Sequence, residues 1–209
     1  MGQRAVALCA DLADEAQVRR LVPDCIAALG HIECVVNNAS LFDKDTAPTF
    51  GYEKWLNMAA INVGAPLALA WALHETIPDA ARDDETLRGS IINVLDQKLY
   101  NMNPDYLSYT LTKAALQAAT VTLAQALAPK LRVVAVAPGL TLRSGEQTDE
   151  RFADAHRRTP LARASTPADV VDAVCYLADA RGVTGATLRV DGGQHRVPSP
   201  RDVMFMTGA

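Results

Sequence analysis

A tyrosine and a lysine four residues apart are the first pair in this sequence whose types and spacing predict chemistry. Tyr109 and Lys113 stand in the run Tyr-Thr-Leu-Thr-Lys, so on a helix both side chains share one face. A nearby ammonium favours the phenolate and lowers the pKa of a tyrosine, which would suit Tyr109 to give a proton to a developing anion. Alone, this spacing also fits a solvated lysine beside a half-buried tyrosine, so its meaning depends on the rest of the chain.

The elements that must position this pair alternate along the sequence between short apolar runs and longer stretches with helical spacing. The runs predict five strands, at residues 4–9, 32–36, 89–95, 131–137 and 186–190. The helical stretches lie at residues 14–29, 52–77, 106–128 and 166–178. Residues 141–160 are polar without a clear period, and we expect a lid or mobile loop there.

This alternation predicts βαβ units, and therefore a Rossmann-type, doubly wound parallel sheet in a single α/β domain over residues 1–209. Ligands of such sheets bind outside the carboxyl ends of the strands. Polar or conformationally special residues follow the predicted strands, at Asn37-Asn38, Asp96, Pro138-Gly139 and Asp191-Gly192-Gly193. We therefore expect the chemistry at that edge of the sheet.

Composition narrows the class of protein. The 209 residues are 49% apolar and 21% charged, which is typical of a globular domain, and the net charge of −4 offers no basic footprint for nucleic acid. No apolar run reaches the roughly 18 residues that span a bilayer, and the first residues do not resemble a secretory signal. Four cysteines without a Cys-x-x-Cys spacing and four scattered histidines predict no metal site. These features favour a cytoplasmic protein without nucleic-acid or membrane partners.

Six short motifs, in the right order, resemble the short-chain dehydrogenase/reductase family and cover nearly the whole chain. They are Ala10-Asp11-Leu12, Asn37-Asn38-Ala39-Ser40, Ile61-Asn62-Val63, Tyr109 with Lys113, Pro138-Gly139-Leu140, and Val183-Thr184-Gly185 before Val190-Asp191-Gly192-Gly193. One such motif means little, whereas six in register are hard to obtain by chance.

The resemblance implies a role for each matched residue. Tyr109 would be the general acid, Lys113 would hold the nicotinamide ribose and lower the pKa of Tyr109, and Asn62 would anchor a water that resupplies protons. The matched residues that would contact the cofactor are Asp11 (at the adenine), Leu12, Asn37, Asn38, Ala39, Ser40, Tyr109, Lys113, Pro138, Gly139 and Leu140. Without the resemblance, Asn37-Asn38 and Pro138-Gly139 are equally well read as turns.

One position departs from the family pattern. Most members carry a serine thirteen residues before the tyrosine, and this chain has Asp96 there. Pteridine reductases and dihydromonapterin reductases resemble this arrangement, with an aspartate at that position and a phenylalanine two residues after Asn-Asn-Ala-Ser. By resemblance, Phe42 would stack on a flat pterin ring, Ser40 would bond the pterin or a cofactor phosphate, and Asp96 with Tyr109 would deliver a proton to a ring nitrogen. The alternative for Phe42 is an ordinary loop aromatic packed on the core.

The glycine-rich turn with which family members bind the cofactor pyrophosphate does not occur in this sequence. Residues 4–9 match the family's third strand, so the first two strands would be absent. A truncated or misassigned start, re-pairing of strand 3 with another strand or chain, and a degenerate remnant are the three explanations; we favour the first. NADP is expected from the likeness to pteridine reductases, and NAD is not excluded.

These observations predict an NAD(P)H-dependent oxidoreductase that reduces a dihydropterin-like substrate. The alternatives are a carbonyl or alcohol dehydrogenase of the same family, and a non-catalytic remnant that serves as a binding or scaffold protein. By resemblance, the helices at residues 52–77 and 106–128 would also form a homo-oligomer, either a dimer or a tetramer.

Overall fold

The computed structural model describes residues 4–143, 148–163 and 165–205. Four strands, β1 (Cys34–Asn37), β2 (Gly89–Val94), β3 (Leu131–Pro138) and β4 (Thr187–Val190), form one sheet in the order β1-β2-β3-β4. All three pairings are parallel. The predicted α/β class with a Rossmann-like parallel sheet is confirmed.

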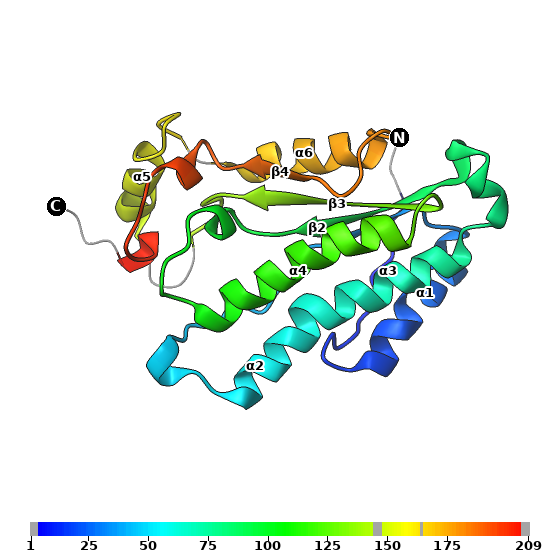
Figure 1. The fold of residues 1–209 in the computed structure, drawn as a ribbon, viewed down its shortest axis with the longest axis horizontal. Helices are drawn as coiled ribbons and strands as arrows, with labels where there is room; N and C mark the ends of the chain where they lie inside the picture. Colours follow the sequence, from blue (N-terminus) through cyan, green and yellow to red (C-terminus); the bar gives the residue numbers. More distant parts are fainter. Residues whose placement is uncertain (1–3, 144–147, 164, 206–209) are drawn as a thin grey trace.

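Helices cover both faces of this sheet (Figure 1). On one face lie α3 (Ala65–Thr76) and α4 (Leu107–Ala126), with α1 (Glu15–Leu29) packed outside α3; α6 (Pro167–Asp179) covers the other. Side chains of a strand alternate between faces, so Ile91 joins the core under α3 and α4 while Ile92 joins the core under α6. Burial on both faces explains why β2 and β3 are apolar without a polar alternation.

Local signals in the sequence set several helix ends. The side chain of Asp14 accepts hydrogen bonds from two backbone amides at the start of α1, and Gly30 ends that helix with a φ of 96°. Thr166 and Asp169 form a reciprocal capping box at the start of α6. The stretch predicted as one helix at residues 52–77 is α2 (Tyr52–Ala59) and α3, joined by a π-helical turn at Ala60–Gly64.

Short 3₁₀ turns lie at Ala47–Thr49, Asp79–Arg82, Glu85–Leu87, Gln97–Tyr100, Gln194–Arg196 and Val203–Phe205. By length and apolar composition alone, the continuous stretch Tyr52–Thr76 qualifies as a membrane-crossing helix. In this fold its buried residues pack against α1, α4 and the sheet.

Two predictions about elements are wrong. Residues 4–9 form no strand: they are exposed, with Val6 and Leu8 each 42% accessible, because no described strand lies beside them to accept their backbone hydrogen bonds. The region 141–160 is not only a loop, because it contains α5 (Asp149–Arg157). Asp154 of α5 pairs with Arg157 in the same helix and with Arg158 just after it, and ion pairs at this spacing support a helix.

Gly89 provides a test of the packing at the start of β2. A β-carbon there would lie 2.6 Å from Cδ1 of Ile77 and 3.0 Å from the backbone oxygen of Glu33. We expect Gly89→Ala to lower the free energy of unfolding by about 1–3 kcal/mol through overpacking, measured by urea denaturation. Gly182→Ala is the control, since nothing lies within 4 Å of its added β-carbon. Equal stability of the two variants would contradict this packing.

Candidate active site

The carboxyl ends of the parallel strands meet at one edge of the sheet, and the predicted site residues gather there. Asn37 ends β1, Asp96 follows β2 by two residues, and Pro138 ends β3. The first two strands are also tied by side chains, because Asn37 Nδ2 donates to Asn93 Oδ1 at 2.8 Å. Asn37 is therefore a buried tie between strands, while Asn38, Ala39 and Ser40 beyond it are exposed.

Tyr109 and Asp96 form the central contact of the site. The phenol of Tyr109, in the first turn of α4, donates a hydrogen bond to Asp96 Oδ2 at 2.8 Å. The other carboxylate oxygen of Asp96 accepts from the backbone amide of Lys98 at 2.7 Å, which fixes the carboxylate at the start of a 3₁₀ turn. A direct hydrogen bond thus joins two side chains that are thirteen positions apart in the sequence.

Burial and the contact between the two groups shift the pKa values of Asp96 and Tyr109. Burial raises the pKa of the Asp96 carboxyl, against the hydrogen bonds from Lys98 and Tyr109 that lower it. Burial also raises the pKa of Tyr109 well above its ordinary value, and the adjacent carboxylate of Asp96 raises it further. The expectation that Lys113 lowers the pKa of Tyr109 is therefore wrong in this structure. The phenol stays protonated, and Asp96 is the member of the pair whose shift favours an unusual, protonated form.

Lys113 lies one turn along α4 from Tyr109 but does not reach its hydroxyl. Its Nζ donates to the backbone oxygen of Val94, the last residue of β2, at 2.7 Å and lies 5.6 Å from the centroid of the Tyr109 ring. Burial lowers its pKa from 10.5 to about 8, and the charge of Asp96 opposes that shift. The side chain thus places a desolvated ammonium at the end of the central strand.

Asn62 holds the loop after β1 against α4. It stands in the π-helical turn, a local distortion often found at functional sites. Its Oδ1 accepts from the amide of Leu41 (2.8 Å) and the hydroxyl of Ser40 (3.2 Å), and its Nδ2 donates to the oxygen of Leu41 and to Thr112, both at 3.0 Å. Because these contacts use the side-chain amide fully, a water held by Asn62 would have to bind another atom of the residue.

Phe42 directly follows Ser40 and Leu41, the two residues that Asn62 binds, and it lies against the start of α4. Its ring stacks on Tyr106 with centroids 4.2 Å apart and meets Tyr109 edge-on at 4.6 Å. Tyr106 is buried and has a φ of 56°, a left-handed conformation unusual for a large residue. Buried Asp45 anchors the far side of the loop, because its carboxylate accepts from both the amide and the hydroxyl of Ser108 in the first turn of α4.

A cavity of about 200 Å³ brings together five of the predicted residues. It is lined by Phe42, Asp96, Tyr109, Gly139 and Leu140, with Gln97, Lys98, Thr141, Leu142, Gln194, Asp202 and Val203 completing the wall. Asp11 and Leu12 do not line this cavity. Asp11 caps the turn before α1, and Leu12 lines a separate groove between α1 and the α2–α3 stretch.

Sequence reasoning missed the part of the wall that comes from the C-terminal segment. Lys98 is buried and pairs with Asp202 at 3.0 Å. Arg201 binds Asp105 through two hydrogen bonds of 2.8 Å. These pairs hold the segment around Arg201 and Asp202 across the cavity. The only signal in the sequence was a lysine two residues after Asp96, and nothing local indicates that its partner lies 104 residues away.

Comparison with known proteins places this geometry in a family. A family model described as enoyl-(acyl carrier protein) reductase matches residues 1–195. An uncharacterized oxidoreductase of Methylorubrum extorquens is 31% identical over 92% of this chain and 77% of its own length. The putative ketoacyl reductase 2 of the granaticin polyketide synthase of Streptomyces violaceoruber is 32% identical over 89% of this chain and 75% of its own length.

The chain belongs to the short-chain dehydrogenase/reductase family. Members are NAD(P)-dependent oxidoreductases, so the chain is placed in a family of redox enzymes. Among solved structures, it is similar to the FolM alternative dihydrofolate reductase 1 of Brucella canis, crystallised with NADP. The TM-score is 0.80 and the identity 37%, over 90% of this chain and 72% of the other. The predicted truncation at the N-terminus stays a prediction.

By resemblance, three groups at this edge of the sheet would contact the nicotinamide half of such a cofactor. Gly139 lies where β3 ends, and a β-carbon on it would come within 2.8 Å of Asp191 and Gln194, so only glycine permits this close approach. The buried ammonium of Lys113 and the exposed run Asn38-Ala39-Ser40 lie at the ends of the neighbouring strands. These groups would hold a ribose and its neighbouring phosphate through hydrogen bonds from Lys113 and Ser40.

The lowered pKa of Lys113 predicts that this lysine reduces the free energy of unfolding, although activity requires it. Folding that lowers the pKa from 10.5 to about 8 costs up to about 3 kcal/mol when the lysine is protonated in both states. Unfolding takes up a proton between pH 8 and 10.5, so this cost is full below pH 8 and fades as the pH rises to 10.5. We expect Lys113→Met to raise the free energy of unfolding by roughly 1–3 kcal/mol at pH 7 and to abolish turnover.

Urea denaturation at pH 7 and at pH 10 measures this effect. The advantage of Lys113→Met over the natural protein should shrink at the higher pH. Lys54→Met is a matched control, because Lys54 is a partly exposed lysine that bonds one backbone oxygen and for which no such cost is expected. A pH-independent difference, or lower stability of Lys113→Met at pH 7, would show that Lys113 does not carry this cost.

Proposed function

We propose that this protein is an NADPH-dependent reductase of a dihydropterin-like substrate. The observation that carries the proposal is the part-buried hydrogen bond between Tyr109 and Asp96, beside the ring of Phe42. The likeness to a dihydrofolate reductase of Brucella canis that was crystallised with NADP supports it. NADPH rather than NADH is proposed on that likeness.

The pair of Tyr109 and Asp96 suits the reduction of a ring C=N bond. Such a reduction adds a hydride to carbon and a proton to nitrogen, and the bound cofactor supplies the hydride. Burial raises the pKa of Asp96 and so favours its protonated form, and the hydrogen bond to Tyr109 gives the proton a path from that carboxyl through the phenol to the ring nitrogen. A carboxylate beside the phenol would instead repel the oxyanion that forms when a ketone is reduced.

Phe42 provides a flat surface for a heterocycle. Its ring is 39% exposed although it contacts Tyr106 and Tyr109, and it lines the cavity that also contains Asp96. Hydrogen bonds of Asn62 with Leu41 and of Asp45 with Ser108 fix the loop on both sides of this ring. A planar substrate stacked on Phe42 would lie in the same cavity as Asp96 and Tyr109.

A carbonyl reductase is the second candidate, favoured by the likeness to a putative ketoacyl reductase of Streptomyces violaceoruber. It predicts reduction of ketones and tolerance of Asp96→Ser, because a serine hydroxyl polarises a carbonyl without repelling the oxyanion. A scaffold protein without catalysis is the third. Saturable NADPH binding, followed by energy transfer from Trp55 and Trp71, would eliminate it.

With NADPH and dihydrobiopterin, we expect Asp96→Ala to lower kcat/KM by at least about 100-fold, the usual scale of a lost proton donor. We expect Phe42→Ala to raise KM roughly tenfold with a smaller change in kcat, because it removes a stacking surface. Steady-state kinetics from NADPH absorbance measure both effects.

Phe50→Ala is the matched control, since Phe50 has nearly the same exposure, 38%, but contacts Tyr52 and Trp55 outside the cavity. Full activity of Asp96→Ser on ketones, with no turnover of dihydrobiopterin by the natural protein, would replace the pterin proposal by the carbonyl one.

Homo-oligomerisation is also part of this proposal. Exposed apolar side chains lie along α2, α3 and α4, at Leu56, Leu67, Trp71, Leu111 and Val121. We expect light scattering to give a mass that is a multiple of 22.4 kDa, and Leu56→Glu combined with Val121→Glu to reduce it. A monomer for the natural protein would contradict this part.

A further inference from the structure

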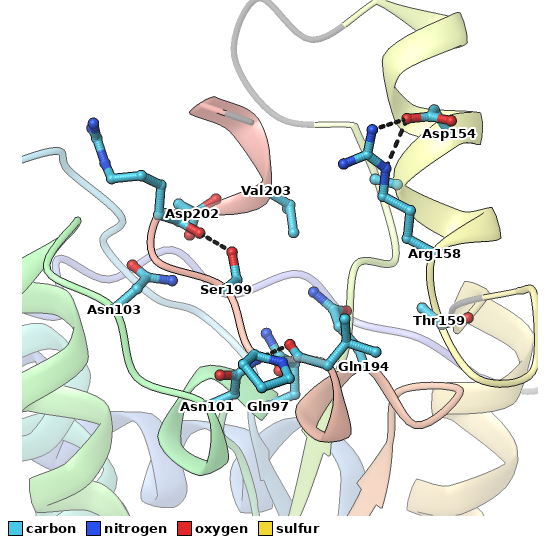
Figure 2. Close-up of a pocket in the computed structure, with 14 residues that line it drawn as sticks. Gln97, Asn101, Asn103, Asp154, Arg158, Thr159, Gln194, Ser199, Asp202 and Val203 are labelled. Carbon is cyan, nitrogen blue, oxygen red and sulfur yellow. Dashed lines mark hydrogen bonds and ion pairs between the residues drawn. The ribbon is translucent and has the colours of Figure 1, made fainter. Parts of the chain in front are cut away.

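A second cavity adjoins the one that holds Tyr109 and Asp96. It has a volume of about 80 Å³. Four residues, Gln97, Gln194, Asp202 and Val203, line both cavities and therefore form a partition one side chain thick. The far side of the second cavity comes from α5 and the residues that follow it. Arg158 lies on that side, opposite Val203 (Figure 2). A substrate ring in the first cavity would thus have a built space for a substituent beside it.

Most charged groups around this second cavity are already neutralised by protein partners. Arg201 directs both Nε and Nη2 to Asp105, and Asp202 pairs with the buried ammonium of Lys98. These pairs hold the segment around Arg201 and Asp202 in place, and they neutralise the charges of both residues. The remaining cation on the lining is Arg158.

Arg158 uses only one edge of its guanidinium. Nε and Nη2 both contact the same oxygen of Asp154, Oδ2, at 3.0 and 2.8 Å. In the described part of the chain, the other edge, which contains Nη1, contacts no carboxylate. An arginine edge with two parallel N–H donors matches a carboxylate in geometry and charge. The side chain is 40% accessible, so a ligand can reach it.

Gln97, on the partition, is a second and independent indication of a ligand. Its Oε1 atom is buried and has no hydrogen-bond partner among the described residues. Buried acceptors without partners are rare in folded proteins. A ligand that crosses the partition with an N–H group would supply the missing donor. The cavity therefore offers an acceptor near the ring site and a cationic edge farther out.

We propose that this second cavity binds a carboxylate-bearing tail of the substrate, with Arg158 as the residue that selects it. The inference rests on the proposed function, because the ring must occupy the neighbouring cavity. It predicts a preference for pterins that carry an amide-linked acidic tail, such as folates, over pterins with short neutral side chains. Arg158 contacts no reacting atom, so it determines specificity and not the rate of the chemical step.

Paired binding measurements on the full chain test this proposal, with folate and biopterin as probes in the presence of NADP. For Arg158→Gln, we expect the Kd for folate to rise about tenfold and the Kd for biopterin to stay within twofold. Arg157→Gln is the matched control, because Arg157 contacts the same Asp154, at 3.5 Å, but does not line the cavity. Both variants lose one partner of Asp154, so a merely structural effect on α5 would move them together.

Three outcomes are distinguishable. A selective loss of folate affinity in Arg158→Gln alone supports the tail subsite. Equal affinities of the two variants for folate, with biopterin still bound, overturn the subsite and leave the proposed function standing. Failure of the natural protein to bind either pterin, when NADP binds saturably, overturns the proposed function and the subsite with it.

Discussion

The parallel pairing of β2 with β3 is the constraint on which the site depends. Both strands are buried on both faces, so their register is fixed by packing from α4 on one side and α6 on the other. Because the strands run in the same direction, Asp96 and Gly139 leave the sheet at the same edge. Helix α4 connects β2 to β3. Its first turn lies at that same edge, where Tyr109 donates a hydrogen bond to Asp96.

Burial gives this edge its chemical character, and it does so at the expense of stability. Tyr109 and Lys113 are buried and Asp96 is partly buried, and for each of them burial is the largest cause of the pKa shift. Desolvation disfavours the charged form of every group. The carboxyl therefore gains proton affinity, the lysine loses it, and the phenol stays protonated. Burial thus shifts Asp96 and Lys113 towards their uncharged forms, while Tyr109 keeps its ordinary neutral form.

The surrounding segments are fixed by specific ties. Asn62 bonds the loop that carries Phe42, and Asp45 bonds that loop to the start of α4. Ion pairs from Arg201 and Asp202 hold the C-terminal segment over the cavity. Segments without regular structure can position functional groups only when their backbone is bound in this way. The result is a cavity whose walls come from the loop after β1, the segments that follow β2 and β3, and the C-terminal residues Gln194, Asp202 and Val203.

The sequence by itself determined the class of fold, the order of the elements and the central pair of residues. Apolar runs and helical spacing are local properties, and the motifs around Asn37, Tyr109 and Pro138 are local as well. Tertiary structure decided the rest. Whether residues 4–9 form a strand depends on a neighbour to pair with, and the pKa of Tyr109 depends on the balance between Asp96, Lys113 and burial. The pairing of Lys98 with Asp202 joins residues 104 apart. Such contacts arise only when distant segments are packed together, because charge and desolvation act through space and not along the chain.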